Sequence, residues 1–417
     1  MRTLRNAIAN FWRYAMDHRF DRSLIKYFDW PLFFIVIAIS LFGVVCIFSA
    51  TTTSVTERPA TVMEMLATQP INSARLQLIW VGASVVGMAL LIYFSYEVYG
   101  RAADVLYVIN LLMLLVVLGM EAGRGGMKGW FTWGSNQERT FQPSEVGKIA
   151  IIIALAKAFA RRARPIMRFR DMLSLLLYIA IPLVLIIAQP DVGTGLVYLA
   201  IFAMLVLASG TNWKLIAAVV LVLALLIVPV WYFANSTMDN FRLTRILIWL
   251  NPEAYPEEGA QVINAKIAAS SGGLFGKGIV SPGSFASLGY ISDDHTDFIF
   301  AITCESFGMV GAVSLLIAYA FLIGRLVYLS LRVKDALGSY MIIGVMGMLL
   351  AHIIENLCMV IGLLPVTGIP LPFMSYGGSN LVTNMLGIGL VMNIVMRDRA
   401  SEESRAQGSV VQRALQI

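Results

Sequence analysis

Apolar runs recur along the whole chain, separated by shorter segments rich in charged residues, glycine or proline. A run of about 20 apolar residues is long enough to cross a hydrocarbon core of ~30 Å as a helix. The pattern predicts ten such spans, at residues 31–50, 76–95, 103–120, 146–160, 172–188, 192–208, 213–234, 298–324, 340–362 and 380–396. We therefore expect an all-α polytopic membrane protein with about ten transmembrane helices.

The composition supports this prediction and limits the kinds of partner that we expect. Hydrophobic residues make up 58% of the 417 residues and charged residues 13%, whereas roughly a quarter of a soluble domain is charged. A soluble protein of buried helices would need more charge on its surface. The net charge of +6 lies beside the ends of apolar runs, so we expect contact with anionic membrane lipid and no nucleic acid. Cys46, Cys304 and Cys358 lack CxxC spacing, which predicts neither a disulfide framework nor a zinc site.

The basic residues also orient the spans. They gather in segment 1–30, in the loop at 161–170 and in the tail at 397–417. Cytoplasmic loops of membrane proteins carry the excess of Lys and Arg, and an even number of spans places all three segments on that side. We expect a multi-pass protein with both termini cytoplasmic, a transmembrane domain at 31–396 and a disordered polar tail. The first segment lacks the features of a signal peptide, so the first span should be retained.

The opposite side then receives five connections, at residues 51–75, 121–145, 189–191, 235–297 and 363–379. Glycine, proline and polar residues concentrate in them. The longest connection, which precedes the eighth span, contains short apolar pieces and glycine turns. It is predicted to be a structured extracytoplasmic loop, since loops of that length are uncommon unless functional or disordered. No internal repeat of the kind found in inverted-repeat transporters is present.

The first chemical motif is QPSEVGK at 142–148, where the fourth span begins. Proline and Ser144 suit a helix start, and Glu145 lies in the first turn, where the helix dipole favours an anion. Glu145 and Lys148 are three residues apart and share a face, so they can form an ion pair. A lysine inside a membrane span indicates a functional site by default. Gln142 and Ser144 lie beside it in the same motif. The alternative is an ion pair that only holds the helix.

A second motif, QPDVGTG at 189–195, forms a tight turn between two spans. Its small residues allow close packing of the helix that follows. Asp191 is either a ligand or the N-cap of that helix, and we favour the cap.

The long loop carries a third group of candidates, Arg245 and the run SSGGLFGKG at 270–278. Glycines let the backbone approach a ligand, and Arg245 or Lys277 could meet a phosphate. The run lacks the GxxxxGK[ST] spacing of a nucleotide-binding loop. An ordinary glycine turn is the alternative.

The fourth motif, DDHTDFIF at 293–300, places Asp297 where the loop meets the eighth span. Partial burial at the edge of the low-dielectric region makes a carboxylate a better general base. His295 and Thr296 lie directly beside it. Glu305 is ~12 Å further along the helix, too far to share one reacting atom. The alternative role for Asp297 is the N-cap of the eighth helix.

The fifth motif, PVTGIPLPFMSYGGS at 365–379, contains three prolines and three glycines, which prevent a continuous helix. Unwound backbone at membrane depth is tolerated where protein or a wet cavity covers it, so the segment is predicted to form a cavity wall. Upstream, His352, Glu355 and Asn356 share one face of the ninth helix. They favour an internal polar network over a metal site.

These five motifs, in this order over residues 30–396, resemble the RodA/FtsW/SpoVE (SEDS) family. That family comprises glycosyltransferases that polymerise lipid II into peptidoglycan strands with a class B penicillin-binding protein. The resemblance implies an enzyme of the bacterial cytoplasmic (inner) membrane. Its expected partners are lipid II, the nascent glycan strand, a class B penicillin-binding protein and membrane lipid.

The resemblance also assigns residues. Asp297 matches the essential carboxylate of the family, Glu145 and Lys148 match the pair at the active cavity, and Ser375 and Tyr376 match the segment that lines it. The remaining expected substrate-binding or cavity residues are Gln142, Ser144, Arg245, Lys277, His295, Thr296 and Glu305. Three segments depart from the family pattern: Lys128-Gly129-Trp130, Ile291-Ser292-Asp293 and Glu305-Ser306.

The expected reaction is processive glycosyl transfer at the outer face. Asp297 would take the proton from the 4-hydroxyl of the acceptor sugar as this oxygen attacks the anomeric carbon of the lipid-linked donor. Lys148 and Arg245 would neutralise the diphosphate leaving group, with a divalent cation (Mg²⁺ or Mn²⁺) as similar proteins suggest. The alternatives are a lipid II flippase and a scaffold without chemistry. The opening FDWPLF and the short tail favour an elongation (RodA) role over a septal (FtsW) or sporulation role.

Overall fold

The computed structural model describes residues 2–51, 71–120, 129–133, 138–162, 166, 169–217, 241–255, 258–291 and 294–414. Its longer helices are α1 (Arg2–Asp17), α2 (Trp30–Ala50), α4 (Asn72–Tyr93), α5 (Tyr96–Leu118), α6 (Pro143–Ala160), α7 (Phe169–Ala188), α8 (Val192–Ala208), α10 (Phe241–Leu250), α11 (Glu258–Ser271), α12 (Ile299–Arg332), α13 (Ala336–Val360) and α14 (Gly378–Ala414). Two 3-10 turns, Arg22–Tyr27 and Pro252–Ala254, and a hairpin of β1 (Phe131–Trp133) and β2 (Glu138–Phe141) complete the described elements.

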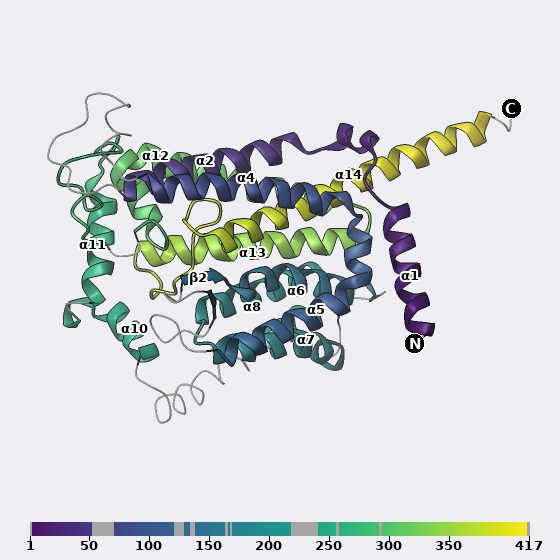
Figure 1. Cartoon of the computed structure of the whole chain (residues 1–417), viewed down its shortest axis with the longest axis horizontal. Coiled ribbons are helices and arrows are strands. Elements are labelled where there is room, and N and C mark those ends of the chain that lie inside the picture. The colour runs from purple at the N-terminus through teal and green to yellow at the C-terminus, as the bar shows by residue number, and fades with distance from the viewer. Residues whose placement is uncertain are drawn as a thin grey trace.

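The apolar runs have become long helices that lie side by side (Figure 1). Seven of the described helices are long and apolar enough to cross a membrane: α2, α4, α5, α7, α12, α13 and α14. α8 is a shorter apolar helix, and α6 carries three charged residues, Glu145, Lys148 and Lys157. The predicted span at 213–234 lies, beyond its first five residues, outside the described residues. The chain is a multi-pass membrane protein, and the count of ten spans stays a prediction.

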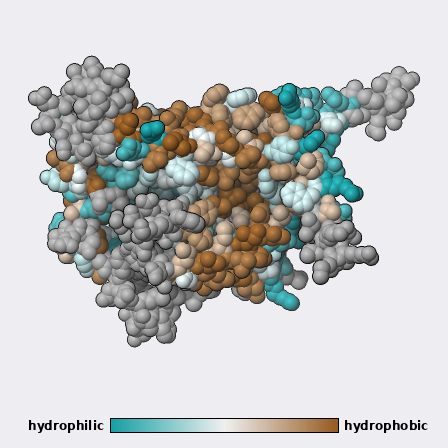
Figure 2. Space-filling view, in the orientation of Figure 1, coloured by the Kyte–Doolittle hydropathy of each residue, from teal (hydrophilic) through white to brown (hydrophobic). Residues whose placement is uncertain are grey.

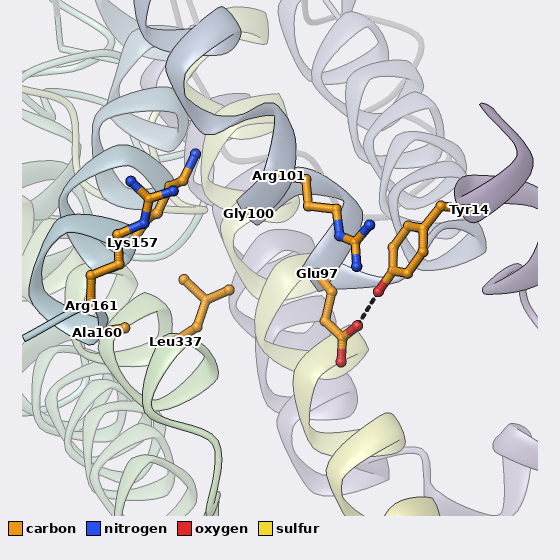
Figure 3. Close-up of a pocket in the computed structure, with 8 residues that line it drawn as sticks. All are labelled: Tyr14, Glu97, Gly100, Arg101, Lys157, Ala160, Arg161 and Leu337. Carbon is orange, nitrogen blue, oxygen red and sulfur yellow. Dashed lines mark hydrogen bonds between the residues drawn. The ribbon is translucent and has the colours of Figure 1, made fainter. Parts of the chain in front are cut away.

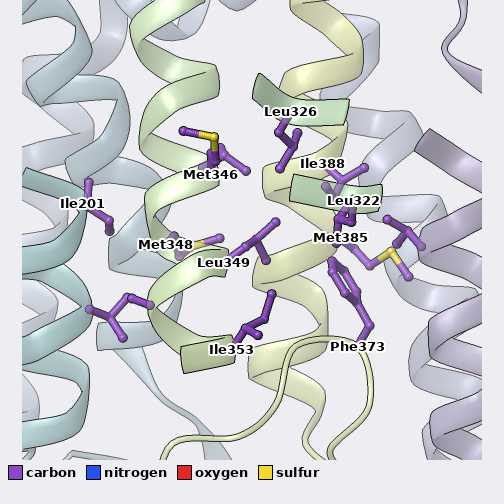
Figure 4. Close-up of a cluster of buried hydrophobic side chains, with 14 of the residues drawn as sticks. Ile201, Leu322, Leu326, Met346, Met348, Leu349, Ile353, Phe373, Met385 and Ile388 are labelled. Carbon is purple, nitrogen blue, oxygen red and sulfur yellow. The ribbon is translucent and has the colours of Figure 1, made fainter. Parts of the chain in front are cut away.

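The bundle has a centre and a periphery. Two-thirds of the membrane window of α13 and 83% of that of α14 are buried, against 28% for α4, α5 and α7. Leu349 and Ile353 of α13 pack with Leu322 of α12 and Met385 of α14 (Figure 4). The outward faces of the peripheral helices form a broad apolar band with polar residues toward the ends (Figure 2). Such a band is what the hydrocarbon core of a lipid bilayer requires of a protein surface.

The two ends of the bundle differ. One end, which we call the terminal end, carries α1 and the last turns of α14; the other, the motif end, carries α10, α11 and the 363–377 loop (Figure 1). The long loop is structured where it is described, because α11 packs against α12. The tail, expected to be disordered, is instead helical as far as Ala414. Glu402 pairs with Lys334 at 2.7 Å and Glu403 with Lys26 at 2.9 Å, and these contacts hold the first turns of the extension.

Candidate functional site

The start of α6 buries an ion pair inside the bundle. Pro143 occupies the first helical turn, and Glu145 follows it in that turn, as the motif predicts. Both Glu145 and Lys148 are buried, with 2.7 Å between Oε1 and Nζ. A buried charge needs a partner and further hydrogen bonds, so the contacts around this pair matter for both stability and chemistry.

Two other helices complete those contacts. His352 of α13 lies 2.7 Å from Lys148 through Nε2, and its Nδ1 lies 3.2 Å from the carbonyl oxygen of Pro370. Since a carbonyl can only accept, Nδ1 carries the hydrogen and Nε2 accepts from the ammonium of Lys148. On the other side, Asn380 of α14 donates to Glu145 Oε2 at 3.1 Å and accepts from Asn384 at 2.9 Å. The pair is therefore held from α6, α13 and α14 together.

Asp297 lies at the entrance to α12 and faces the proline-rich segment. The N-cap position of α12 is Phe298, which leaves Asp297 one residue outside the helix, so the N-cap alternative does not apply. Its main-chain carbonyl accepts from Asn356 at 2.7 Å, and the same amide donates to the carbonyl of Ile369 at 2.8 Å. A Cβ added to Gly368 would lie 3.6 Å from Asp297 Oδ2, which places the carboxylate beside this glycine.

Arg245 brings a positive charge to the same place from α10. Its guanidinium donates to the carbonyl of Val366 at 3.3 Å. Burial lowers the pKa of Arg245, and the negative charges of Asp297 and Asp191 act in the opposite direction. The cation is thus within electrostatic range of the predicted base.

The HTD and SYGG motifs are joined through backbone contacts. Ser375 donates through Oγ to the carbonyl of Thr296 at 2.6 Å and accepts from the Leu371 amide at 2.8 Å. The Tyr376 amide donates to the carbonyl of His295 at 2.9 Å, and the two rings lie 5.4 Å apart. These contacts fix the segment that carries Asp297 against the unwound segment at 365–377.

Asp191 acts as the predicted cap. Its Oδ1 accepts from the Thr194 amide at 3.1 Å at the start of α8. Its Oδ2 accepts from Gln142 at 2.9 Å. Ser144 is buried, and its carbonyl accepts from Tyr198 at 3.1 Å. Gln142 and Ser144 therefore tie the beginning of α6 to α8.

Lys277 and Glu305 form a separate cluster. Their Nζ and Oε1 atoms are 2.6 Å apart, Glu305 is buried, and the Phe285 amide also donates to Oε1 at 2.8 Å. Glu305 is eight residues beyond Asp297, which corresponds to ~12 Å along α12.

Two glycines of the 272–278 loop, Gly272 and Gly276, face α12. α12 is broken at Gly308 (φ 65°), and the 272–278 loop supplies the hydrogen bonds that the broken turn lacks. The Lys277 amide donates to the Glu305 carbonyl at 2.8 Å, and the Met309 amide donates to Gly273 at 2.9 Å. A Cβ on Gly276 (φ 79°) would overlap the Ser306 carbonyl. Gly272 and Gly276 are needed here for close backbone packing.

Sequence reasoning missed several residues of the site. Asn380 and Asn384 interrupt the last apolar span, and polar residues inside a span are the signal that could have indicated them. Gln77 of α4 was missed as well. It donates to the Ser375 carbonyl at 3.0 Å and accepts from the Gly377 amide at 3.3 Å. Lys128 and Asp293, by contrast, lie outside the described residues.

The residues present do not form a protein cage for a metal. In the described ranges no group of three or more His, Cys, Asp or Glu side chains could hold an ion. His352 and Asn356 instead belong to the polar network set out above. Glu355 lies within electrostatic range of Lys148 and Asp191, and its Oε2 has no hydrogen-bond partner in the part of the chain that is described.

Comparison with known proteins gives one consistent result. "Peptidoglycan glycosyltransferase MrdB" of Escherichia coli (strain K12) is 35% identical over 318 residues, which are 75% of this chain and 84% of that protein. "Stage V sporulation protein E" of Bacillus subtilis (strain 168) is 32% identical over 326 residues, 77% of this chain and 86% of that protein.

A solved structure agrees with these relatives. It is described as "Structural coordination of polymerization and crosslinking by a peptidoglycan synthase complex", and it matches with a TM-score of 0.70 at 31% identity, covering 89% of this chain and 98% of its own. The family model described as "Cell cycle protein" matches residues 29–400, from the start of α2 into the helical tail. The chain therefore belongs to the FtsW/RodA/SpoVE family, as its five motifs indicate.

Proposed function

We propose that this protein is a peptidoglycan glycosyltransferase that polymerises lipid II into glycan strands at the outer face of the bacterial cytoplasmic membrane. One observation carries the proposal. The segment with Asp297 and the buried Glu145–Lys148 pair meet on the same unwound segment, through Asn356 to Ile369 and through His352 to Pro370. The relative named MrdB supports the reaction class.

In this proposal Asp297 is the general base. Its carboxylate accepts the proton of the acceptor sugar's 4-hydroxyl, the sugar oxygen bonds to the anomeric carbon, and the bond from that carbon to the lipid diphosphate breaks. The diphosphate leaves with its electron pair and needs nearby positive charge. Arg245 is only partly buried and supplies that charge by contact. Lys148 is fully buried, so its role is to fix the polar network and contribute its field.

A divalent cation stays a prediction, and the steps above use the protein's own residues. Mg²⁺ is often held by substrate phosphates and one or two carboxylates, and Asp297 is the carboxylate that such an arrangement would use.

The proposed setting is elongation of the cell wall with a class B penicillin-binding protein as partner. The structural neighbour is a synthase complex that couples polymerization and crosslinking, which supports an assembly of this kind. Both termini at one end of the bundle support a cytoplasmic location for both (Figure 1). A septal role is the second candidate, and depletion separates the two: loss of rod shape supports elongation, and filamentation supports division.

The decisive experiment replaces Asp297 by Asn and measures lipid II polymerisation by the purified protein with its partner. Loss of a general base should lower the rate by roughly 10²–10⁴-fold. Asp171→Asn, an exposed acid in the first turn of α7, is the matched control and should keep full activity. Full activity of the Asp297 variant would remove the proposed base, and flipped monomer without glycan strands would favour a flippase.

A further inference from the structure

A pocket lies at the terminal end, far along the bundle from Asp297. It is a widely open hollow with a volume of about 470 Å³, and Figure 3 shows the side chains that line it. Four helices line it, with Tyr14 from α1, Glu97, Gly100 and Arg101 from α5, Lys157, Ala160 and Arg161 from α6, and Leu337 from α13. Gly100 lets α13 approach, since a Cβ there would lie 2.6 Å from Leu337 Cδ2. None of these residues belongs to the five motifs.

The lining carries an excess of positive charge. Arg101 and Arg161 are exposed. Figure 3 shows Arg161 and Lys157 on one side of Leu337, and Arg101 on the other side beside Tyr14 and Glu97. Lys157 is neutralised by Asp104 at 2.7 Å. In the part of the chain that is described, no acid is paired with Arg161. A single acid, Glu97, lines the pocket itself.

Tyr14 contacts both that acid and Arg101. Its hydroxyl donates to Glu97, and the Arg101 guanidinium lies 3.3 Å from the centre of the Tyr14 ring. Burial, together with Glu97, raises the pKa of Tyr14 to about 12, so the hydroxyl stays protonated at neutral pH. The pocket therefore offers an anion the guanidinium groups of Arg101 and Arg161 beside the single carboxylate of Glu97.

An apolar track leads away from the pocket along α5. Val105, Val108, Leu112 and Val116 follow Arg101 at intervals of three or four residues, so they share its face. Each of the four is more than half exposed on the apolar band. A ligand bound at Arg101 can thus extend an alkyl chain over this face, which an inorganic anion cannot use.

We propose that this pocket binds the phosphate group of an anionic phospholipid, with one acyl chain along the Arg101–Val116 face of α5. The headgroup bridges Arg101 and Arg161 and so connects α5 to α6 beneath α1. The site is independent of the proposed catalysis, because it shares no residue with it. Phosphatidylglycerol is the probe that represents this chemistry.

The test measures lipid binding to the purified full chain by native mass spectrometry. Phosphatidylglycerol, phosphatidylcholine and inorganic phosphate are compared as separate ligands, which distinguishes a charged lipid from lipid in general and from free phosphate. Arg101→Gln and Arg161→Gln should each weaken phosphatidylglycerol binding about fivefold, since one cation near a membrane surface contributes about 1 kcal/mol. Arg101→Lys keeps the charge and should stay within about twofold of the natural protein on the same scale.

Arg332→Gln is the matched control, because Arg332 is exposed at the end of α12 and does not line the pocket. Its binding should equal that of the natural protein. Equal affinity of Arg101→Gln, Arg161→Gln and the natural protein would overturn the proposal. So would equal binding of phosphatidylcholine, or saturable phosphate binding as strong as that of phosphatidylglycerol. Elution of each variant as a folded monodisperse species guards against loss of binding through unfolding.

Discussion

Two lysine–carboxylate pairs are buried or nearly buried in this molecule, and they differ in what surrounds them. Lys148–Glu145 and Lys277–Glu305 have almost the same separation, 2.7 and 2.6 Å. The first pair is contacted by side chains from α13 and α14, and through His352 it reaches the segment that faces Asp297. The second is contacted by the Phe285 amide, and its lysine belongs to the 272–278 loop that packs into the break in α12.

The difference teaches that an ion pair at membrane depth is not by itself a functional site. A pair whose remaining hydrogen-bond partners are side chains of several other helices can tune a reaction centre. A pair whose lysine belongs to a loop packed into a helix break can brace that non-helical segment, which membrane depth would otherwise disfavour. We infer that Lys148–Glu145 belongs to the reaction centre and Lys277–Glu305 to the brace. Four substitutions test this distinction, and the largest effect comes first.

Lys148→Met should destabilise the protein by about 3–5 kcal/mol, because it leaves Glu145 buried without a counter-charge. Equilibrium unfolding in mixed micelles measures this. The double variant Lys148→Met with Glu145→Gln removes both charges and should recover most of the lost stability. It should still fail to polymerise lipid II. A double variant that is stable and active would show that the pair only holds α6.

Gly276→Ala should cost about 3 kcal/mol, since it combines overpacking against the Ser306 carbonyl with an unfavourable positive φ. Gly278 (φ 100°) is the matched control, because no atom lies within 4 Å of a Cβ there. Gly278→Ala should therefore cost only about 1 kcal/mol from the backbone term. Equal unfolding free energies for the two variants would mean that the loop does not pack into the α12 break.

A structural feature of these two pairs could be predicted from the sequence only where it depends on residues that are close together in the chain. The apolar runs predicted the long helices, and the position of Asp191 predicted its cap, because hydrophobicity and capping act over a few residues. The Glu145–Lys148 pair follows from i, i+3 spacing on one helix.

The contacts that give the two pairs different surroundings could not be predicted. Lys148 meets His352 across 204 positions, and Glu145 meets Asn380 across 235. These contacts between helices depend on how the helices pack. The spacing of residues within one helix does not specify that packing. The same holds for the glycines at 272–278, whose partner is the backbone of a different helix. The ordered tail was missed because its polar composition is compatible with disorder until Lys26 and Lys334 are placed beside it.

His352→Ala should cost about 2 kcal/mol, because the buried ammonium of Lys148 loses a hydrogen-bond acceptor. His352→Gln offers a carbonyl oxygen in place of Nε2 and should recover part of the loss. Since His352 touches Lys148 and Pro370 and not the reacting atoms, its loss should lower kcat more than it raises KM for lipid II. Unchanged kcat in a folded Ala variant would separate the Lys148 network from the reaction.

Glu305→Gln should have the smallest effect, about 1 kcal/mol of stability. The amide oxygen can still accept from the Phe285 amide and from Lys277, which is partly exposed and can turn its charge toward water. If this pair is a brace, polymerisation by the folded variant should stay within a few-fold of the natural protein on the scale set by Asp297→Asn. A loss as large as that of Asp297→Asn, with the fold intact, would place Glu305 in the reaction centre. The brace assignment would then be wrong, and the two pairs would belong to one extended site.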